Sequence, residues 1–139
     1  MRLRKNAKID LLKRVPLFAQ CSKQELAAVA AVADEIDLRQ GKELTTQGRP
    51  GREFLVLVEG EAEVRKNGRK LRTLQDGDFF GEIALVTKRP RTATVVAKTP
   101  VRVLVVTDRA FQSLLERSPS IHSKVLQALA ERVAGDDLP

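Results

Sequence analysis

The sequence predicts a mainly β protein with flanking helices: an antiparallel β-roll or jelly-roll barrel with two N-terminal and two C-terminal helices. Three observations predict this fold class. From about residue 35, apolar residues alternate with polar ones with a period of two. Turn residues then separate short β-rich segments about every 8–12 positions, which is typical of an antiparallel sandwich or barrel. On both sides of this region, apolar residues recur at helical spacing instead.

Two short helices are predicted before residue 35. Ile9, Leu12 and Val15 suggest an amphipathic helix that runs into a turn at Pro16. The segment Ser22-Lys23-Gln24-Glu25 is a capping box, in which a hydroxyl and a carboxylate each satisfy a backbone donor at the start of the next helix. Leu26, Val29 and Ala33 then fall on one face of that helix.

Short strands are predicted through the middle of the chain, with helices after them. Asn67-Gly68 is the clearest hairpin signal, because both residues accept positive φ. A helix is expected over Asp108–Arg117, and Ser118-Pro119 begins a last helix that ends near Gly135. The expected strands lie at 36–38, 43–46, 54–58, 62–65, 70–74, 92–97 and 101–106. We expect a single domain over 1–139, with N-terminal helices at 1–34, the barrel at 35–107 and C-terminal helices at 108–139.

The composition limits the kinds of protein that this chain can be. The chain has 139 residues, of which 42% are hydrophobic, so one core of ordinary size is expected. No apolar run approaches the roughly 20 residues that span a bilayer, and the N-terminus lacks the apolar stretch of a signal peptide. We therefore expect no membrane span and a cytoplasmic location. The single cysteine, Cys21, excludes an internal disulfide, and with His122 alone it cannot form a zinc site.

The net charge of +7 is concentrated at the N-terminus. Residues 1–14 hold six basic residues against Asp10, a net charge of +5. One interpretation is a basic arm for an acidic partner, nucleic acid or a membrane surface. The other, which we favour, is a solvated first helix, because charge runs are weak signals by themselves.

The most informative segment joins Gly77–Leu85 to Arg89–Val95. Residues 82–85 can form one helical turn, whose first amides lack an internal partner and carry partial positive charge. Gly81 lets a ligand approach the backbone closely, and the planar fork of Arg91 suits two phosphate oxygens. Glu82 would repel a phosphate, but it suits a sugar hydroxyl and could also position Arg91. A cyclic nucleotide needs such a hydroxyl acceptor and such an anion cradle close together.

These residues resemble the phosphate-binding cassette of the cyclic nucleotide-binding domain family, here over residues 81–92. That family includes bacterial catabolite activator proteins, protein kinase A regulatory subunits and cyclic-nucleotide-gated channels. Gly-Glu-Ile-Ala-Leu, Arg-Thr-Ala-Thr-Val, the Gly60 turn and the Gly77–Phe80 segment match its pattern, as do Phe111, Leu114, Leu115 and Pro119 in the following helices. Together these motifs are specific, and they span nearly the whole chain.

The resemblance implies a role for each matching residue. Glu82 would accept from the ribose 2′-hydroxyl, and Gly81 would belong to the ligand site by letting the ligand approach the backbone. The amides of Ile83 and Ala84, the Arg91 guanidinium and Thr92 would hold the cyclic phosphate. Val64 and Thr73 would line the base pocket. The last helix would close as a lid over the base through Leu126, Leu129, Arg132 and Val133.

We therefore expect a non-enzymatic sensor whose ligand is cyclic AMP or cyclic GMP, with an unknown downstream protein partner. No catalytic residue, metal or further cofactor is expected, because the common nucleotide-hydrolase and nucleophile motifs are missing. Thr92 permits either nucleotide, and we favour cyclic AMP. No helix-turn-helix is present, which argues against nucleic acid as a partner. The alternative is a ligand-independent interaction domain that docks an acidic partner or polyanion through its basic N-terminus. Oligomeric state, effector and whether the chain is part of a longer protein stay open.

Overall fold

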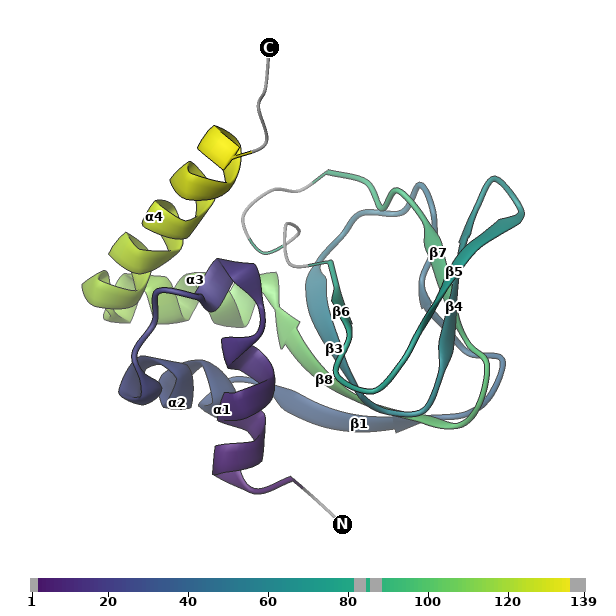
Figure 1. The fold of residues 1–139 in the computed structure, drawn as a ribbon, viewed down its shortest axis with the longest axis horizontal. Helices are drawn as coiled ribbons and strands as arrows, with labels where there is room; N and C mark the ends of the chain where they lie inside the picture. Colours follow the sequence, from purple (N-terminus) through teal and green to yellow (C-terminus); the bar gives the residue numbers. More distant parts are fainter. Residues whose placement is uncertain (1–2, 82–84, 86–88, 136–139) are drawn as a thin grey trace. The chain divides into compact units, whose positions relative to one another are not determined.

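The computed structural model describes residues 3–81, 85 and 89–135, apart from the side chains of 132–135. Its internal contacts group into two units, residues 1–32 with 110–139, and residues 33–109. The first unit is helical and the second is built from strands (Figure 1). None of the helices in the described part of the chain is long and apolar enough to cross a membrane.

The helices follow the predicted order. They are α1 (Lys5–Lys13), the short 3-10 helix η1 (Pro16–Phe18), α2 (Lys23–Ala31), α3 (Asp108–Arg117) and α4 (Pro119–Gly135). The first helix ends before Pro16 as predicted, because Pro16 lacks the N–H that would continue α1, and Pro16 begins η1. Phe18 packs edge-on against Phe111, with ring centroids 5.8 Å apart. Apolar side chains that are at most 1% exposed build this helical unit: Leu12, Phe18, Leu26, Phe111 and Ile121.

The start of α2 is held by a capping box and an ion pair. Ser22 Oγ accepts from the Glu25 amide, and the Glu25 carboxylate accepts from the Ser22 amide at 2.8 Å, as predicted. The same carboxylate lies 2.5 Å from Lys124 Nζ on α4. The Lys124 hydrogen bond, together with the Ser22 amide, lowers the pKa of Glu25 to about 2. Glu25 therefore stabilises both the start of α2 and its contact with α4.

Cys21 lies just before α2 and is only 8% exposed. Burial, reinforced by the nearby Glu25 carboxylate, raises the pKa of the Cys21 thiol to about 11. The thiol is therefore protonated at neutral pH and serves as a small apolar side chain.

The strands form two antiparallel four-stranded sheets, which confirms the predicted β-roll. One sheet has the order β1-β8-β3-β6 and the other the order β2-β7-β4-β5. The strands are β1 (Asp34–Leu38), β2 (Glu43–Thr45), β3 (Glu53–Glu59), β4 (Ala62–Lys66), β5 (Arg69–Leu74), β6 (Phe79–Phe80), β7 (Thr94–Ala97) and β8 (Val101–Thr107). Buried side chains from both sheets meet in one barrel core: Leu55, Leu57, Ala62, Val64, Leu74, Val95, Ala97, Val101 and Val103.

Two strands differ from the prediction. β6 was not predicted, because two residues show no periodicity; it forms because Phe79 pairs with Val56 on β3 and its ring packs against Phe54. β7 begins at Thr94 rather than at residue 92. The residues before Thr94 bond instead to the loop that follows β2, an arrangement that only the folded chain creates.

The predicted hairpin joins β4 to β5. Asn67 has φ 53° and Gly68 has φ 78°, the positive values that this turn needs. A bulge between Val64 and Arg65 shifts the register near the turn.

Candidate functional site

Arg91 is held in place through its own backbone. Its amide donates to the Arg49 carbonyl at 2.8 Å, and its carbonyl accepts from the Gly48 amide at 2.9 Å. Next to it, Pro50 and Pro90 form an isolated antiparallel bridge. The loop after β2 and the segment before β7 are thus paired, and this pairing fixes where the Arg91 side chain begins.

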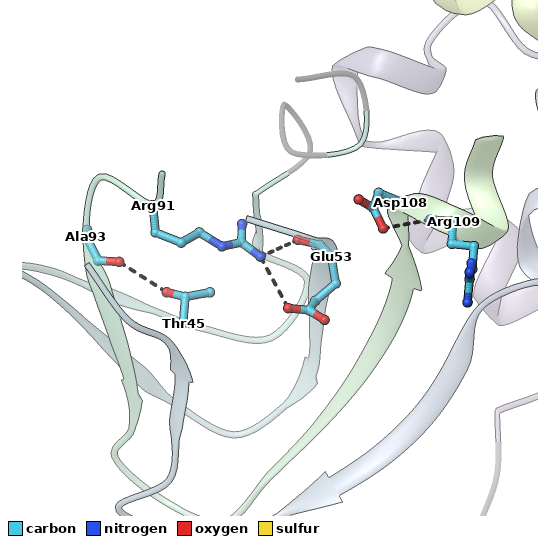
Figure 2. A network of polar contacts seen from close by, with 6 residues as sticks. All are labelled: Thr45, Glu53, Arg91, Ala93, Asp108 and Arg109. Atoms are coloured by element: carbon cyan, nitrogen blue, oxygen red, sulfur yellow. Dashed lines mark hydrogen bonds and ion pairs between the residues drawn. The ribbon is translucent and has the colours of Figure 1, made fainter. Parts of the chain in front are cut away.

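The Arg91 guanidinium is largely buried and lies against Glu53, the first residue of β3 (Figure 2). Its Nη2 donates to the Glu53 carbonyl oxygen at 2.5 Å and lies 3.7 Å from Oε1 of the same residue. The Arg91 side chain is 9% exposed, whereas the Glu53 side chain is 40% exposed. Burial lowers the pKa of Arg91, and the Glu53 carboxylate opposes that shift. Since an arginine stays charged in proteins, the site holds a nearly buried cation, and among the described residues Glu53 is its partly solvated counter-ion.

Gly81 provides the space for this guanidinium. A Cβ built at position 81 would lie 2.3 Å from Arg91 Nη1 and 3.0 Å from the Glu53 carbonyl oxygen. Gly81 also has φ +82°, which other residues rarely adopt. The structure thus brings together two of the predicted site residues, Gly81 and Arg91, and adds Glu53 to them.

Other predicted phosphate and ribose residues lie next to this cluster in the sequence. Glu82, Ile83 and Ala84 fall outside the described residues, so their predicted roles stay predictions. Leu85, which ends the predicted helical turn, is 1% exposed. Thr92, next to Arg91, is exposed.

The two residues predicted for the base pocket lie on opposite faces of the β4–β5 hairpin. Val64 is 7% exposed and pairs across the sheet with Val95 on one side and Arg72 on the other. Thr73 pairs with Glu63 instead. Residues paired across an antiparallel ladder share a face, and adjacent residues alternate. Arg72, rather than Thr73, therefore shares the face of Val64.

The four residues predicted to form a lid all belong to α4. Leu126 is 54% exposed and Leu129 is half-buried. The side chains of Arg132 and Val133 lie outside the described part of the structure. Among the described residues, no group of three or more histidine, cysteine or acidic side chains could hold a metal ion.

Sequence reasoning missed Glu53 and Arg72. The carbonyl of Glu53 contacts Arg91 because β3 starts beside the loop that carries Arg91. No local sequence pattern predicts a contact between residues so far apart in the chain. Arg72 could have been found from the hairpin register, but the bulge at Val64 and Arg65 makes that register hard to count from the turn.

Comparison with known proteins identifies the family of this chain. Residues 35–118 match the family model "Cyclic nucleotide-binding domain". The chain is 38% identical over 106 residues to a cAMP-dependent protein kinase regulatory subunit of Aspergillus niger, covering 75% of this chain and 26% of that protein. It is 37% identical over 138 residues to the same kind of subunit in Mycosarcoma maydis, covering 91% of this chain and 25% of that protein. The chain thus spans about a quarter of the length of these relatives.

A solved structure shows the same fold. The N-terminal domain of a transcriptional regulator from Streptomyces coelicolor A3(2) superposes with a TM-score of 0.85 at 31% identity, covering 92% of this chain and 95% of that one. The residues that match the family model begin at the second residue of β1 and continue through β8, so they include Gly81 and Arg91. The chain therefore belongs to the cyclic nucleotide-binding domain family, whose domains are regulatory and not catalytic.

Proposed function

We propose that this domain binds a cyclic nucleotide and acts as a non-enzymatic sensor. The nearly buried guanidinium of Arg91, packed on Gly81, is the observation that carries the proposal. A buried cation is costly unless it is paired, and Glu53 at 3.7 Å offers only a partly solvated carboxylate. A phosphate diester would supply a further negative charge and accept from the guanidinium fork.

The remaining roles complete this proposal. Glu82 would accept from the ribose 2′-hydroxyl, and the Ile83 and Ala84 amides and Thr92 would join Arg91 on the phosphate. Leu126, Leu129, Arg132 and Val133 of α4 would repack over the base, which gives the two-state element that a switch requires. The effector that reads this switch, like a cytoplasmic location, stays a prediction.

Two observations bear on which nucleotide binds. The two relatives named above are cAMP-dependent kinase subunits, which supports cyclic AMP. The register that pairs Val64 with Arg72 supports guanine, because arginine donors suit the O6 and N7 acceptors of that base. We propose cyclic AMP as the first ligand to test, with cyclic GMP as its competitor.

Titration calorimetry on wild type, Arg91→Ala and Arg89→Ala tests the binding proposal. Removing a charge-assisted contact from a mostly buried site should cost about 2–4 kcal/mol, or roughly thirty- to a thousandfold in affinity. Arg89 is exposed and two residues away, so its removal takes the same charge from the same loop and should change affinity little. Equal affinity of Arg91→Ala and wild type would overturn the proposal.

A further inference from the structure

The β4–β5 hairpin carries a dense basic surface, and Arg72 is its one cation that also belongs to the proposed nucleotide site. Five of the eight residues from 65 to 72 are lysine or arginine. All eight residues of this segment, which we call the basic hairpin, are exposed. β5 is an edge strand of its sheet, and Figure 1 shows the turn at the outer edge of the barrel. The surface is therefore open to a large partner.

The charge of the basic hairpin is mostly not neutralised within the molecule. In the described part of the chain, one carboxylate, that of Glu63, forms ion pairs with it, contacting Arg65 Nε and lying 3.9 Å from Lys70 Nζ. One carboxylate against five cations leaves a strong positive field, which acts over about a Debye length of 8–10 Å in physiological salt. An anionic surface is thus the matching partner.

The tip of the basic hairpin is also hydrogen-bonded to a neighbouring loop. Gln47, from the loop after β2, donates through Nε2 to Asn67 Oδ1 at 2.9 Å and accepts from the Asn67 amide at 2.9 Å. This pair of bonds fixes the turn from outside the hairpin. A preorganised surface loses less conformational entropy on docking.

The exposure of Leu71 favours a lipid surface over DNA as the anionic partner. Leu71 is 58% exposed and lies between Lys70 and Arg72. Charges alone would suit the phosphates of DNA, or would protect an edge strand from pairing with another chain. Neither use gains from an exposed leucine that neighbours the cations in the chain. At a lipid surface an apolar side chain enters the headgroup boundary while flanking cations meet lipid phosphates.

We propose that the basic hairpin docks this domain on an anionic membrane surface, with Leu71 inserted between the lipid headgroups. Each lysine or arginine near such a surface contributes roughly a fivefold gain in affinity. With a single apolar anchor the contact is reversible and weakens as salt is raised. The residues changed in its test, Lys66, Arg69 and Leu71, lie outside the proposed nucleotide site.

Vesicle co-sedimentation tests it, with the whole chain and vesicles of phosphatidylcholine with or without one third phosphatidylserine. Wild type should bind only the anionic vesicles. The double variant Lys66→Glu/Arg69→Glu should bind at least about 25-fold more weakly, and Leu71→Asn several-fold more weakly. The matched control is Arg39→Glu/Lys42→Glu, which makes the same change of charge at two exposed positions in the loop between β1 and β2 and should bind like wild type.

Three outcomes would overturn the proposal. Wild type could fail to bind the anionic vesicles. Leu71→Asn could bind the anionic vesicles like wild type, and a short DNA duplex could fully displace the wild-type protein from them. Together these two results would make the hairpin a general polyanion site. Lys5→Glu/Lys8→Glu could abolish binding while the hairpin variant keeps it, which would move the surface to α1. Thermal unfolding of each variant shows that it is folded, so a loss of binding reports the surface.

Discussion

The Arg91 guanidinium occupies the space that a side chain at position 81 would need, so two residues ten positions apart in the sequence depend on each other. Glu53 completes this arrangement by accepting from Arg91 through its backbone carbonyl. A substitution of the Glu53 side chain would keep that bond, whereas a change at position 81 would disturb it. The site is thus more sensitive to backbone geometry than to its acidic side chain.

Gly81→Ala should lower both stability and nucleotide affinity. The positive φ costs an alanine roughly 1–2 kcal/mol, and the new Cβ would displace the guanidinium. Gly41→Ala is the matched control, since Gly41 has φ +87° and open space around its built Cβ. Chemical denaturation should show a loss of stability in both variants, and a larger one in Gly81→Ala, whose Cβ also meets Arg91 and the Glu53 carbonyl oxygen. Calorimetry should show weakened binding in Gly81→Ala alone; equal affinities would mean that Arg91 simply moves aside.

Arg72→Ala should weaken cyclic GMP more than cyclic AMP. An arginine fork can donate to both O6 and N7 of guanine, but adenine places an amino donor where O6 would be. Competition between the two nucleotides measures the ratio of their affinities. Arg69→Ala removes the same charge from the same strand and should leave the ratio unchanged. An unchanged ratio in Arg72→Ala would remove Arg72 from the base pocket.

At the scale of an element, the start of α2 gathers several stabilising interactions on one carboxylate. Glu25 accepts from the Ser22 amide, accepts from Lys124, and places negative charge at a helix N-terminus. A lowered pKa means that this contribution is complete above pH 4.5 and is lost as the pH falls towards about 2.

Glu25→Gln should therefore destabilise the domain at neutral pH by about 1–2 kcal/mol, a figure reduced for the solvent exposure of Lys124. The difference from wild type should shrink as the pH falls from 4.5 towards 2, because the wild-type carboxyl is then protonated as well. Urea unfolding followed by circular dichroism at several pH values measures this. The exposed residue Glu116 offers a control, Glu116→Gln, which should show no such convergence.

Elements with their own sequence signals were predicted well. The helix over Asp108–Arg117 was found to the residue, because apolar side chains at helical spacing are followed by Ser118-Pro119. The Asn67-Gly68 turn was found because positive φ restricts the residue types that fit. The two-residue β6 and the late start of β7 were missed, because both depend on partners distant in the sequence.

At the scale of the whole molecule, the family and the β-roll were predictable, because motifs, turns and helix spacing all agreed on one fold. Gly81 and Arg91 were also predicted from the sequence as site residues, and they do lie together. The counter-ion of Arg91 and the register that pairs Val64 with Arg72 were not predictable. Both depend on how strands align across the sheets, which local residue patterns leave undetermined.

The buried thiol of Cys21, the single cysteine of the chain, allows the opening of the surrounding helices to be measured by its rate of chemical labelling. A thiol reagent can attach at only one place in the chain, and with its pKa at about 11 the folded thiol is a poor nucleophile at neutral pH. Labelling then waits for the helices around residue 21 to open, so its rate measures the free energy of that opening. If a nucleotide bound in the barrel slows the labelling, its binding also stabilises the helices around Cys21, and no introduced cysteine is needed to measure this.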